Sequence, residues 1–246
     1  MSPIFFANKF LSPNFLIIDD KKEFFHIIKV LRHKLGDKLT LRAPDNELYL
    51  TIISKIEKDK LILEIISKLT KDPEIKFELF LCQSLPKLDK WELILEKGTE
   101  LGVCGFFPLQ TERSIVNLDK KNLLKKYERW NRIIEEAVKQ SGRRKIPELY
   151  SIQKIEELLE NLKNNIEILV AWEKANKSLK EIVKDLGDKI YLFIGPEGSF
   201  SEREIDLLKE NGGKFFNMGP RIFKVETAAI VASSLLLYEK GGLGLI

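Results

Sequence analysis

The C-terminal part of the chain repeats one pattern, and this repeat restricts the fold more than any other feature. Residues 190–194 are an apolar run that is followed by Gly195-Pro196 and a polar helical pattern. Residues 215–218 are a second apolar run, followed by Gly219-Pro220 and an apolar helical pattern. The repeat predicts strand, Gly-Pro loop and helix twice, which is typical of an open α/β sheet. Such sheets bind ligands beyond the carboxyl ends of their strands, so we expect the loops to leave adjacent strands and to form one site.

Two local signals support the helices of this repeat. Ser201 and Glu204 have the spacing of a capping box, which predicts a helix that begins just after the first loop. Glu226 comes at the start of the final helix, where the helix dipole favours a carboxylate.

Composition restricts the possible chemistry of the 246-residue chain, which is long enough for one large domain or two smaller ones. Its net charge is only +4, and it has two histidines and two cysteines. Cys82 and Cys104 form no C-x-x-C motif, so we expect free thiols, a reducing compartment and no metal site. The N-terminus lacks the plan of a signal peptide, and no apolar run reaches the roughly 20 residues that span a bilayer. These features predict a cytoplasmic protein.

The N-terminal residues 1–70 differ from the rest of the chain. One helix is predicted over 20–31, and β-rich runs follow at 38–42, 48–56 and 61–69 with turn signals between them. Short strands with a single helix favour a small β-barrel, and residues 71–73 are the predicted linker that ends this domain.

Strands and helices alternate from residue 74 onward, which predicts an α/β domain over 74–246 with a mainly parallel sheet. Besides the C-terminal repeat, strands are expected at 77–83, 105–109 and 166–171, and helices at 87–101, 118–141 and 178–186.

The longest predicted helix has one apolar face and one mostly basic face. The residues of this second face recur at steps of three or four and are Lys125, Arg129, Arg132, Glu136, Lys139 and Arg143. Arg144 and Lys145 extend the face beyond the end of the helix. Such a face is either solvated or in contact with nucleic-acid phosphates, and the spacing leaves both interpretations open. A second basic cluster around Arg32 is short enough to be only a solvated face.

Several common site motifs are missing. The sequence has no G-x-x-x-x-G-K-[ST], no G-x-G-x-x-G after a strand and no G-x-S-x-G. What remains is a pocket built from loops, with backbone donors and an apolar lining that includes Met218, Ile222, Phe223 and Val225. Such a pocket suits a flat heteroaromatic ligand, but spacing alone does not identify it.

A series of short motifs runs nearly from end to end of the chain. In order they are HIIKVLR at 26–32, GD at 36–37, LPK at 85–87, EKGTELGV at 96–103, TERS at 111–114, RW at 129–130, EA at 136–137, QSGR at 140–143, IGPEG at 194–198, GPRI at 219–222 and ETA at 226–228. Together they resemble the RsmE family, the 16S ribosomal RNA (uracil-N3)-methyltransferases of the SPOUT class. The chain departs from the family where Ser199 replaces a usual second glycine, Phe223-Lys224 replaces Leu-Arg and Gly98 replaces alanine.

The resemblance implies both an architecture and a reaction. It implies an N-terminal PUA-like RNA-binding β-barrel domain over 1–70 and a SPOUT methyltransferase domain over 74–246 with a trefoil knot. It further implies a homodimer, S-adenosylmethionine as methyl donor, and 16S ribosomal RNA of the small ribosomal subunit as substrate.

The same resemblance assigns residues to the site. Those implied to hold the cofactor are Trp172, Gly195, Glu197, Gly198, Met218, Gly219, Ile222, Phe223, Val225, Thr227 and Ala228. Those expected to hold RNA are Arg32, Lys87, Arg113, Arg129, Arg143, Arg144 and Lys224. For catalysis we expect Arg221 to stabilise charge on the uracil oxygens while Glu197 or Glu226, or a water that one of them orients, removes the N3 proton. The alternatives are that Arg221 clamps a phosphate and that Glu226 only caps a helix.

Two other functions stay open on the sequence alone. One is a SPOUT methyltransferase that acts on another RNA or on a ribose 2′-hydroxyl, and the other is a non-catalytic RNA-binding assembly factor. The sequence does not identify the uridine, and it leaves both free RNA and an assembled subunit open as the substrate.

Overall fold

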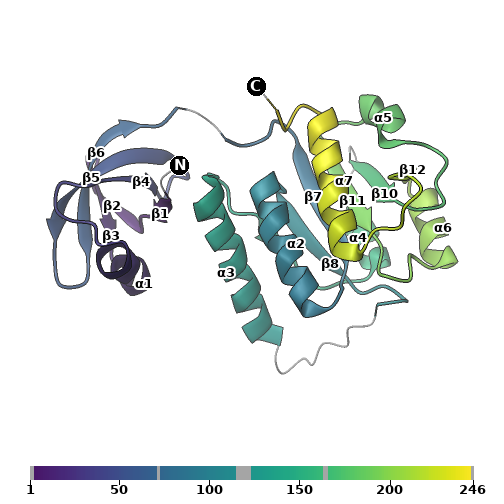
Figure 1. Ribbon diagram of the computed structural model, residues 1–246, viewed down its shortest axis with the longest axis horizontal. Coiled ribbons are helices and arrows are strands. Elements are labelled where there is room, and N and C mark those ends of the chain that lie inside the picture. The colour runs from purple at the N-terminus through teal and green to yellow at the C-terminus, as the bar shows by residue number, and fades with distance from the viewer. Residues whose placement is uncertain (1–2, 71–72, 115–122, 163–165, 245–246) are drawn as a thin grey trace. The chain divides into compact units, whose positions relative to one another are not determined.

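The protein divides into two compact units (Figure 1). The computed structural model describes residues 3–70, 73–114, 123–162 and 166–244. Unit 1 contains Met1–Glu74 and Val138–Lys145, and unit 2 contains Ile75–Ala137 and Ile146–Ile246. Residues 71–72 of the predicted linker and residues 118–122 of the longest predicted helix lie outside the described residues.

Unit 1 is a curled six-stranded sheet with the order β1-β4-β5-β6-β3-β2. Its strands are β1 (Ile4–Phe6), β2 (Lys9–Ser12), β3 (Phe15–Ile18), β4 (Lys38–Arg42), β5 (Leu48–Ile56) and β6 (Leu61–Lys68). All neighbours are antiparallel except β1 and β4. The predicted strands at 38–42 and 48–56 are confirmed. The three N-terminal strands were not predicted, because runs of three or four residues are too short to show an alternating pattern.

The helix predicted over 20–31 consists of two different helical forms. The α-helix α1 (Lys21–Phe25) begins at Asp20, whose carboxylate accepts a hydrogen bond from the Glu23 amide at 2.8 Å. A π-helix, η1 (His26–Val30), continues it, so the prediction of one regular helix is wrong in its hydrogen bonding. The wider π turn buries Ile27, and Leu31 at its end is exposed.

Unit 2 is built on a six-stranded sheet in which every paired strand is parallel. The order is β12-β10-β11-β7-β8-β9. The strands are β7 (Glu78–Ser84), β8 (Gly105–Leu109), β9 (Glu148–Leu149), β10 (Glu167–Ala171), β11 (Lys189–Ile194) and β12 (Lys214–Phe216). The mainly parallel sheet is therefore confirmed, whereas the two-residue β9 was not predicted.

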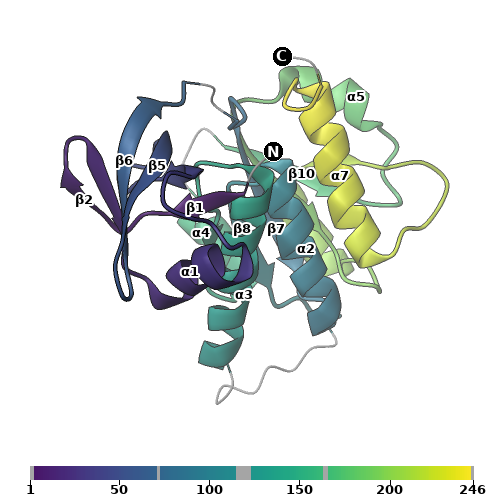
Figure 2. The ribbon, with the colours of Figure 1, turned by 60° about the vertical axis from the view of Figure 1, so that its left-hand side comes forward.

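Helices cover both faces of this sheet (Figures 1 and 2). One layer contains α2 (Leu88–Leu101), α3 (Leu123–Ser141), α5 (Leu179–Ile182, continued by a 3-10 turn, η3, Val183–Asp185) and α7 (Val225–Glu239). The other contains α4 (Ile155–Asn161) and α6 (Glu202–Glu210). Alternate strand residues serve the two layers, because Leu79 and Leu81 pack in the first core and Phe80 and Cys82 in the second.

Helix α4 was not predicted, and Cys82 and Cys104 are free thiols as expected. Within the described residues, no helix is long and apolar enough to cross a membrane.

The two Gly-Pro loops leave β11 and β12, which are not neighbours in the sheet. Strand β10 lies between them and pairs with both. The prediction of adjacent strands is therefore wrong, because the sequence shows the order of elements along the chain but not their order across the sheet. As a result, the loop that follows Ala171 lies between the two Gly-Pro loops.

Candidate functional site

A cavity of about 380 Å³ lies at the carboxyl edge of the unit 2 sheet. It forms there because Ala171 is in register with both Ile194 and Phe216, so the loops after β10, β11 and β12 begin at the same level. The residues that line it are Ala171, Trp172, Glu173, Ile194, Gly195, Pro196, Glu197, Gly198, Ser199, Met218, Gly219, Arg221, Ile222, Phe223, Lys224, Val225 and Ala228.

The first Gly-Pro loop, residues 195–200, is held by an arginine from another loop. Arg113, which follows β8, donates from Nη1 to the Gly198 carbonyl oxygen at 2.7 Å and to the Phe200 carbonyl oxygen at 3.3 Å. At Gly195 a Cβ atom would lie 3.2 Å from the Phe200 amide nitrogen, so the loop closes too tightly for a side chain there.

The end of this loop is also fixed, because it leads into the predicted capping box of α6. The Ser201 hydroxyl accepts from the Glu204 amide at 3.2 Å, and the Glu204 carboxylate accepts from the Ser201 amide at 2.8 Å. The second carboxylate oxygen of Glu204 accepts from the Glu112 amide at 2.9 Å, which joins the helix start to the segment that carries Arg113.

Ser199 stands in the first loop where the family resemblance leads us to expect glycine. Its φ of 61° is in the left-handed region, which side chains rarely adopt. Its amide donates to the Pro196 carbonyl oxygen at 2.9 Å, and its hydroxyl donates to a Glu173 carboxylate oxygen at 3.0 Å. The side chain thus links the first Gly-Pro loop to the loop after β10.

A cluster of three charged side chains includes Glu197, which lines the cavity. Lys90 Nζ is 2.9 Å from Glu197 Oε1 and 3.6 Å from Glu226 Oε2. Partial burial raises the pKa of Glu197, but the hydrogen bonds from Lys90 and from its own backbone amide, with the charges of Lys90 and Lys87, outweigh burial and lower that pKa below its usual value. Glu197 is therefore a carboxylate at neutral pH.

The second Gly-Pro loop, residues 217–224, is held mainly at its start. The Asn217 amide donates to the Lys177 carbonyl oxygen at 3.0 Å, its side-chain amide donates to the Ala175 carbonyl oxygen, and its side-chain oxygen accepts from the Gly219 amide at 3.2 Å. Further along, Ile222 is 88% exposed, and Arg221 makes no hydrogen bond or ion pair with any residue that the structure describes.

The structure brings most of the predicted cofactor residues to one cavity. Trp172, Gly195, Glu197, Gly198, Met218, Gly219, Ile222, Phe223, Val225 and Ala228 all line it, and Arg221 lines it with them. Thr227 and Glu226 do not; Thr227 is exposed and Glu226 lies beside Lys90. Sequence reasoning missed Ala171, Glu173, Ile194 and Ser199 as lining residues, although all four lie at strand ends or in their loops.

The residues expected to hold RNA fall into two groups. Arg32, Lys87 and Lys224 are exposed, and Lys224 also lines the cavity. Arg129 is exposed too, but its Nε lies 2.6 Å from Glu92 Oε1. Arg113 is held by the backbone carbonyls of the first loop.

The other two arginines are engaged within unit 1. Arg143 was expected on an exposed basic face, but it is 3% exposed and its guanidinium contacts Glu74 at 2.8 Å. Arg144 contacts Glu47 at 3.0 Å and the Leu69 carbonyl oxygen at 2.6 Å. The expected exposed face therefore does not include Arg143, because its guanidinium is buried, where the Glu74 carboxylate compensates its charge.

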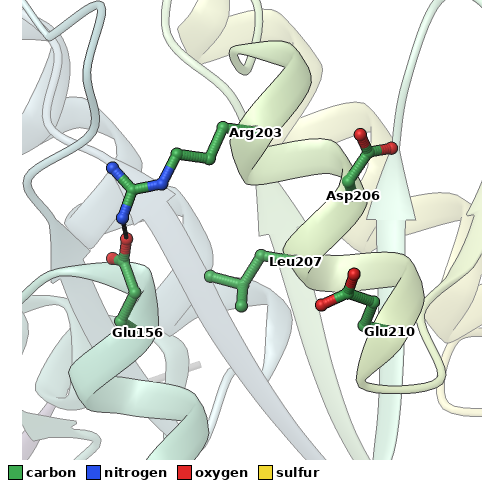
Figure 3. Close-up of a pocket in the computed structure, with 5 residues that line it drawn as sticks. All are labelled: Glu156, Arg203, Asp206, Leu207 and Glu210. Carbon is green, nitrogen blue, oxygen red and sulfur yellow. Dashed lines mark hydrogen bonds and ion pairs between the residues drawn. The ribbon is translucent and has the colours of Figure 1, made fainter.

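A larger cavity of about 510 Å³ lies away from the strand ends, between α4 and α6 (Figure 3). Glu156 and Arg203 pair across it at 3.0 Å, and Asp206, Leu207 and Glu210 complete its lining. It has no glycine loop and no apolar surface beyond Leu207. Within the described residues, no group of three or more His, Cys, Asp or Glu could hold a metal ion. The cavity at the strand ends is therefore the candidate site.

A parallel α/β sheet with a loop-built cavity at its carboxyl edge is the arrangement in which α/β proteins bind small molecules. Comparison with known families makes this class specific. The model of an RNA methyltransferase domain matches residues 73–237, and that of an RNA methyltransferase PUA domain matches residues 18–66.

Similar proteins cover nearly the whole chain. Ribosomal RNA small subunit methyltransferase E of Bacillus subtilis (strain 168) is 34% identical over 93% of this chain and 91% of its own length. Ribosomal RNA small subunit methyltransferase E 2 of Borreliella burgdorferi is 32% identical over 94% of both chains. The crystal structure of the corresponding enzyme from Neisseria gonorrhoeae, bound to S-adenosyl methionine, has a TM-score of 0.86 at 27% identity and covers 97% of this chain and 98% of that one. The chain belongs to the RNA methyltransferase family and, within it, to the ribosomal RNA small subunit methyltransferase E proteins.

Proposed function

We propose that this protein transfers a methyl group from S-adenosylmethionine to N3 of one uridine in the 16S ribosomal RNA of the small subunit. The observation that carries the proposal is the cavity in which Arg221 and Glu197 lie among exposed loop backbone and apolar side chains. Family membership supports the reaction class, since its relatives are named ribosomal RNA methyltransferases and one is solved with the cofactor.

The residues of the cavity fit the proposed cofactor. Met218, Ile222, Phe223 and Val225 offer apolar surface for a heteroaromatic ring, and the Gly-Pro loops offer backbone donors and acceptors for its edge. The volume of about 380 Å³ is in the range of small-molecule sites. When bound, S-adenosylmethionine would supply an activated methyl group.

The chemistry left to the protein is alignment and proton removal. Uracil N3 carries a proton, and its loss places negative charge on the ring oxygens. Arg221 is available to stabilise that charge, because its guanidinium has no partner among the described residues. Glu197 lines the same cavity as a carboxylate and would accept the proton directly or through a water.

The RNA would be held by exposed basic residues. Lys224 lines the cavity, and we add Lys87 before α2, Arg129 on α3 and, in unit 1, Arg32, all of which are exposed. The proposal does not extend to Arg143, whose guanidinium is buried, or to Arg144, which unit 1 engages. Because phosphate contacts release counterions, we expect RNA affinity to fall steeply as salt rises, and a titration of affinity between 50 and 200 mM salt measures this.

Several larger features, predicted from the sequence patterns and the family resemblance, are also proposals. We propose domain boundaries at 1–70 and 74–246, a trefoil knot in the second domain, a homodimer and a cytoplasmic location. Exposed apolar side chains on α2 and α7, namely Leu93, Leu235 and Tyr238, support a surface that a second copy could cover.

Two measurements test the function against its alternatives. Calorimetry should detect binding of S-adenosylmethionine; no binding would favour a non-catalytic assembly factor. Primer extension on ribosomal RNA treated with the enzyme should stop at one uridine, because an N3-methyl group blocks Watson–Crick pairing. Methyl incorporation without such a stop would favour a ribose 2′-hydroxyl acceptor, and incorporation into another RNA alone would contradict the 16S assignment.

A further inference from the structure

Lys90 is the point at which three separate elements of unit 2 meet. It lies in the first turn of α2, whereas Glu197 comes from the first Gly-Pro loop and Glu226 from the first turn of α7. Its ammonium group contacts both carboxylates, at 2.9 Å and 3.6 Å. The side chains of Lys90, Glu197 and Glu226 are 25%, 34% and 17% exposed, so water only partly screens their charges.

The cluster holds two negative charges but one close positive charge. Glu226 Oε2 is buried without a hydrogen bond in the part of the chain that the structure describes. The ammonium group of Lys90 is therefore the nearby positive charge that offsets the negative charge of Glu226. Without that ammonium group the two carboxylates would repel each other, and one of them would tend to stay protonated. Other charged groups surround the cluster: the charge of Lys87, before α2, also lowers the pKa of Glu197, and Glu173 after β10 and Arg221 and Lys224 in the second loop line the same cavity.

We propose that Lys90 is a positioning residue for methyl transfer, which holds Glu197 at the cavity as the proton acceptor and balances Glu226 beneath it. This inference rests on the proposed function. It also separates two residues that the sequence left equivalent, because Glu197 lines the cavity and Glu226 does not. Glu226 is then the second anchor of Lys90 rather than the base.

Lys90 could instead serve only to hold α2 against α7, and pH dependence distinguishes the two roles. The acceptor must be ionised, so activity falls as the pH drops through the pKa of Glu197. The Lys90 hydrogen bond and charge lower that pKa. Losing Lys90 must therefore move the acid limb of the activity profile to higher pH, whereas loss of packing alone would reduce the rate at every pH.

The experiment measures the pH dependence of single-turnover methyl transfer at saturating S-adenosylmethionine and RNA in variants of Lys90 and Glu226. For Lys90→Met we expect the acid limb of the activity profile to shift to higher pH by about 1 unit or more, with a slower rate at neutral pH. Lys90→Arg should return the limb toward the wild-type position. The double variant Lys90→Met, Glu226→Gln should have its acid limb at a lower pH than Lys90→Met alone, since the Glu226 carboxylate that repels Glu197 is gone.

Lys97 provides a matched control on the same helix. It too contacts two carboxylates, Glu96 at 2.7 Å and Glu100 at 2.9 Å, but none of the three lines the cavity. Lys97→Met should leave the acid limb in place. If Lys97→Met moves the limb as far as Lys90→Met does, the effect is not specific and the proposal is overturned.

The outcomes separate this inference from the proposed function. A wild-type protein that binds no S-adenosylmethionine and methylates no RNA overturns both. If the wild type is active but Lys90→Met has its acid limb at the wild-type pH, only the role of Lys90 is overturned. The same holds if the double variant Lys90→Met, Glu226→Gln has its acid limb at the same pH as Lys90→Met. If Lys90→Met does not fold by thermal melting, Glu226→Gln alone decides: we expect activity to persist with the acid limb at or below the wild-type position, and abolished activity would make Glu226 the base.

Discussion

The two Gly-Pro loops are alike in sequence but differ in how firmly the protein holds them. Both follow apolar strands and precede helices at the same edge of the sheet. Arg113, Ser199 and Lys90 restrain the first loop by contacts with carbonyl oxygens and carboxylates. The second is anchored at Asn217, and beyond Gly219 it exposes Arg221 and Ile222.

This difference suggests different roles for the two loops in binding and turnover. A restrained loop presents groups at fixed positions before any ligand arrives, which reduces the entropic cost of binding. A loop with a free arginine and an exposed apolar side chain can use ligand contacts to complete the site. We therefore expect loss of Arg221 from the second loop to affect turnover, and loss of the Arg113 contacts that hold the backbone of the first loop to affect cofactor affinity.

The largest expected effect comes from Arg221→Ala in the open loop. Loss of the charge that stabilises the uracil anion should reduce the single-turnover rate by about 100-fold or more. Calorimetry should show S-adenosylmethionine affinity within about twofold of wild type, because among residues 3–70, 73–114, 123–162 and 166–244 the guanidinium has no partner through which it would organise the cavity.

Arg221→Lys is the control, since it keeps the charge without the planar fork of arginine and should keep part of the rate. If Arg221→Ala retains wild-type turnover but loses RNA affinity, Arg221 is a phosphate clamp and the division between the loops is wrong.

The parts of this site that the sequence predicts are those encoded by neighbouring residues. Strand β11, its loop and the Ser201 cap occur in one continuous stretch, so local periodicity and capping rules predict them. Lys90 was not predicted, because its contact with Glu197 joins residues 107 positions apart. Arg143 was placed by helical spacing, which describes a helix face but not the Glu74 carboxylate that buries its guanidinium.

Arg113→Ala tests the restrained loop and should have an intermediate effect. The variant removes the donor to the Gly198 and Phe200 carbonyls, so we expect S-adenosylmethionine affinity to fall by about five- to tenfold. The rate at saturating cofactor should change less than in Arg221→Ala. Calorimetry and saturation kinetics measure the two quantities.

Arg203→Ala is the matched control for Arg113→Ala. Arg203 is an exposed arginine whose partners, Glu112 and Glu156, lie outside the cavity at the strand ends, so its loss should leave cofactor affinity unchanged. If Arg113→Ala keeps cofactor affinity and instead reduces the salt dependence of RNA binding, Arg113 contacts phosphate, and the first loop does not depend on the Arg113 hydrogen bonds for cofactor binding.

The smallest effect is expected at Ser199, where backbone and side chain oppose each other. Glycine would relieve the left-handed φ of 61°, worth about 1 kcal/mol, but would lose the bond to Glu173 and gain freedom in the unfolded chain, each worth about 0.5–1 kcal/mol. Ser199→Gly should therefore leave the free energy of unfolding and the cofactor affinity nearly unchanged. Ser199→Ala keeps the strain without the bond and should destabilise by about 1 kcal/mol in urea denaturation. Wild-type stability of Ser199→Ala would mean that the hydroxyl does not restrain this loop, which would then depend on Arg113 and Lys90.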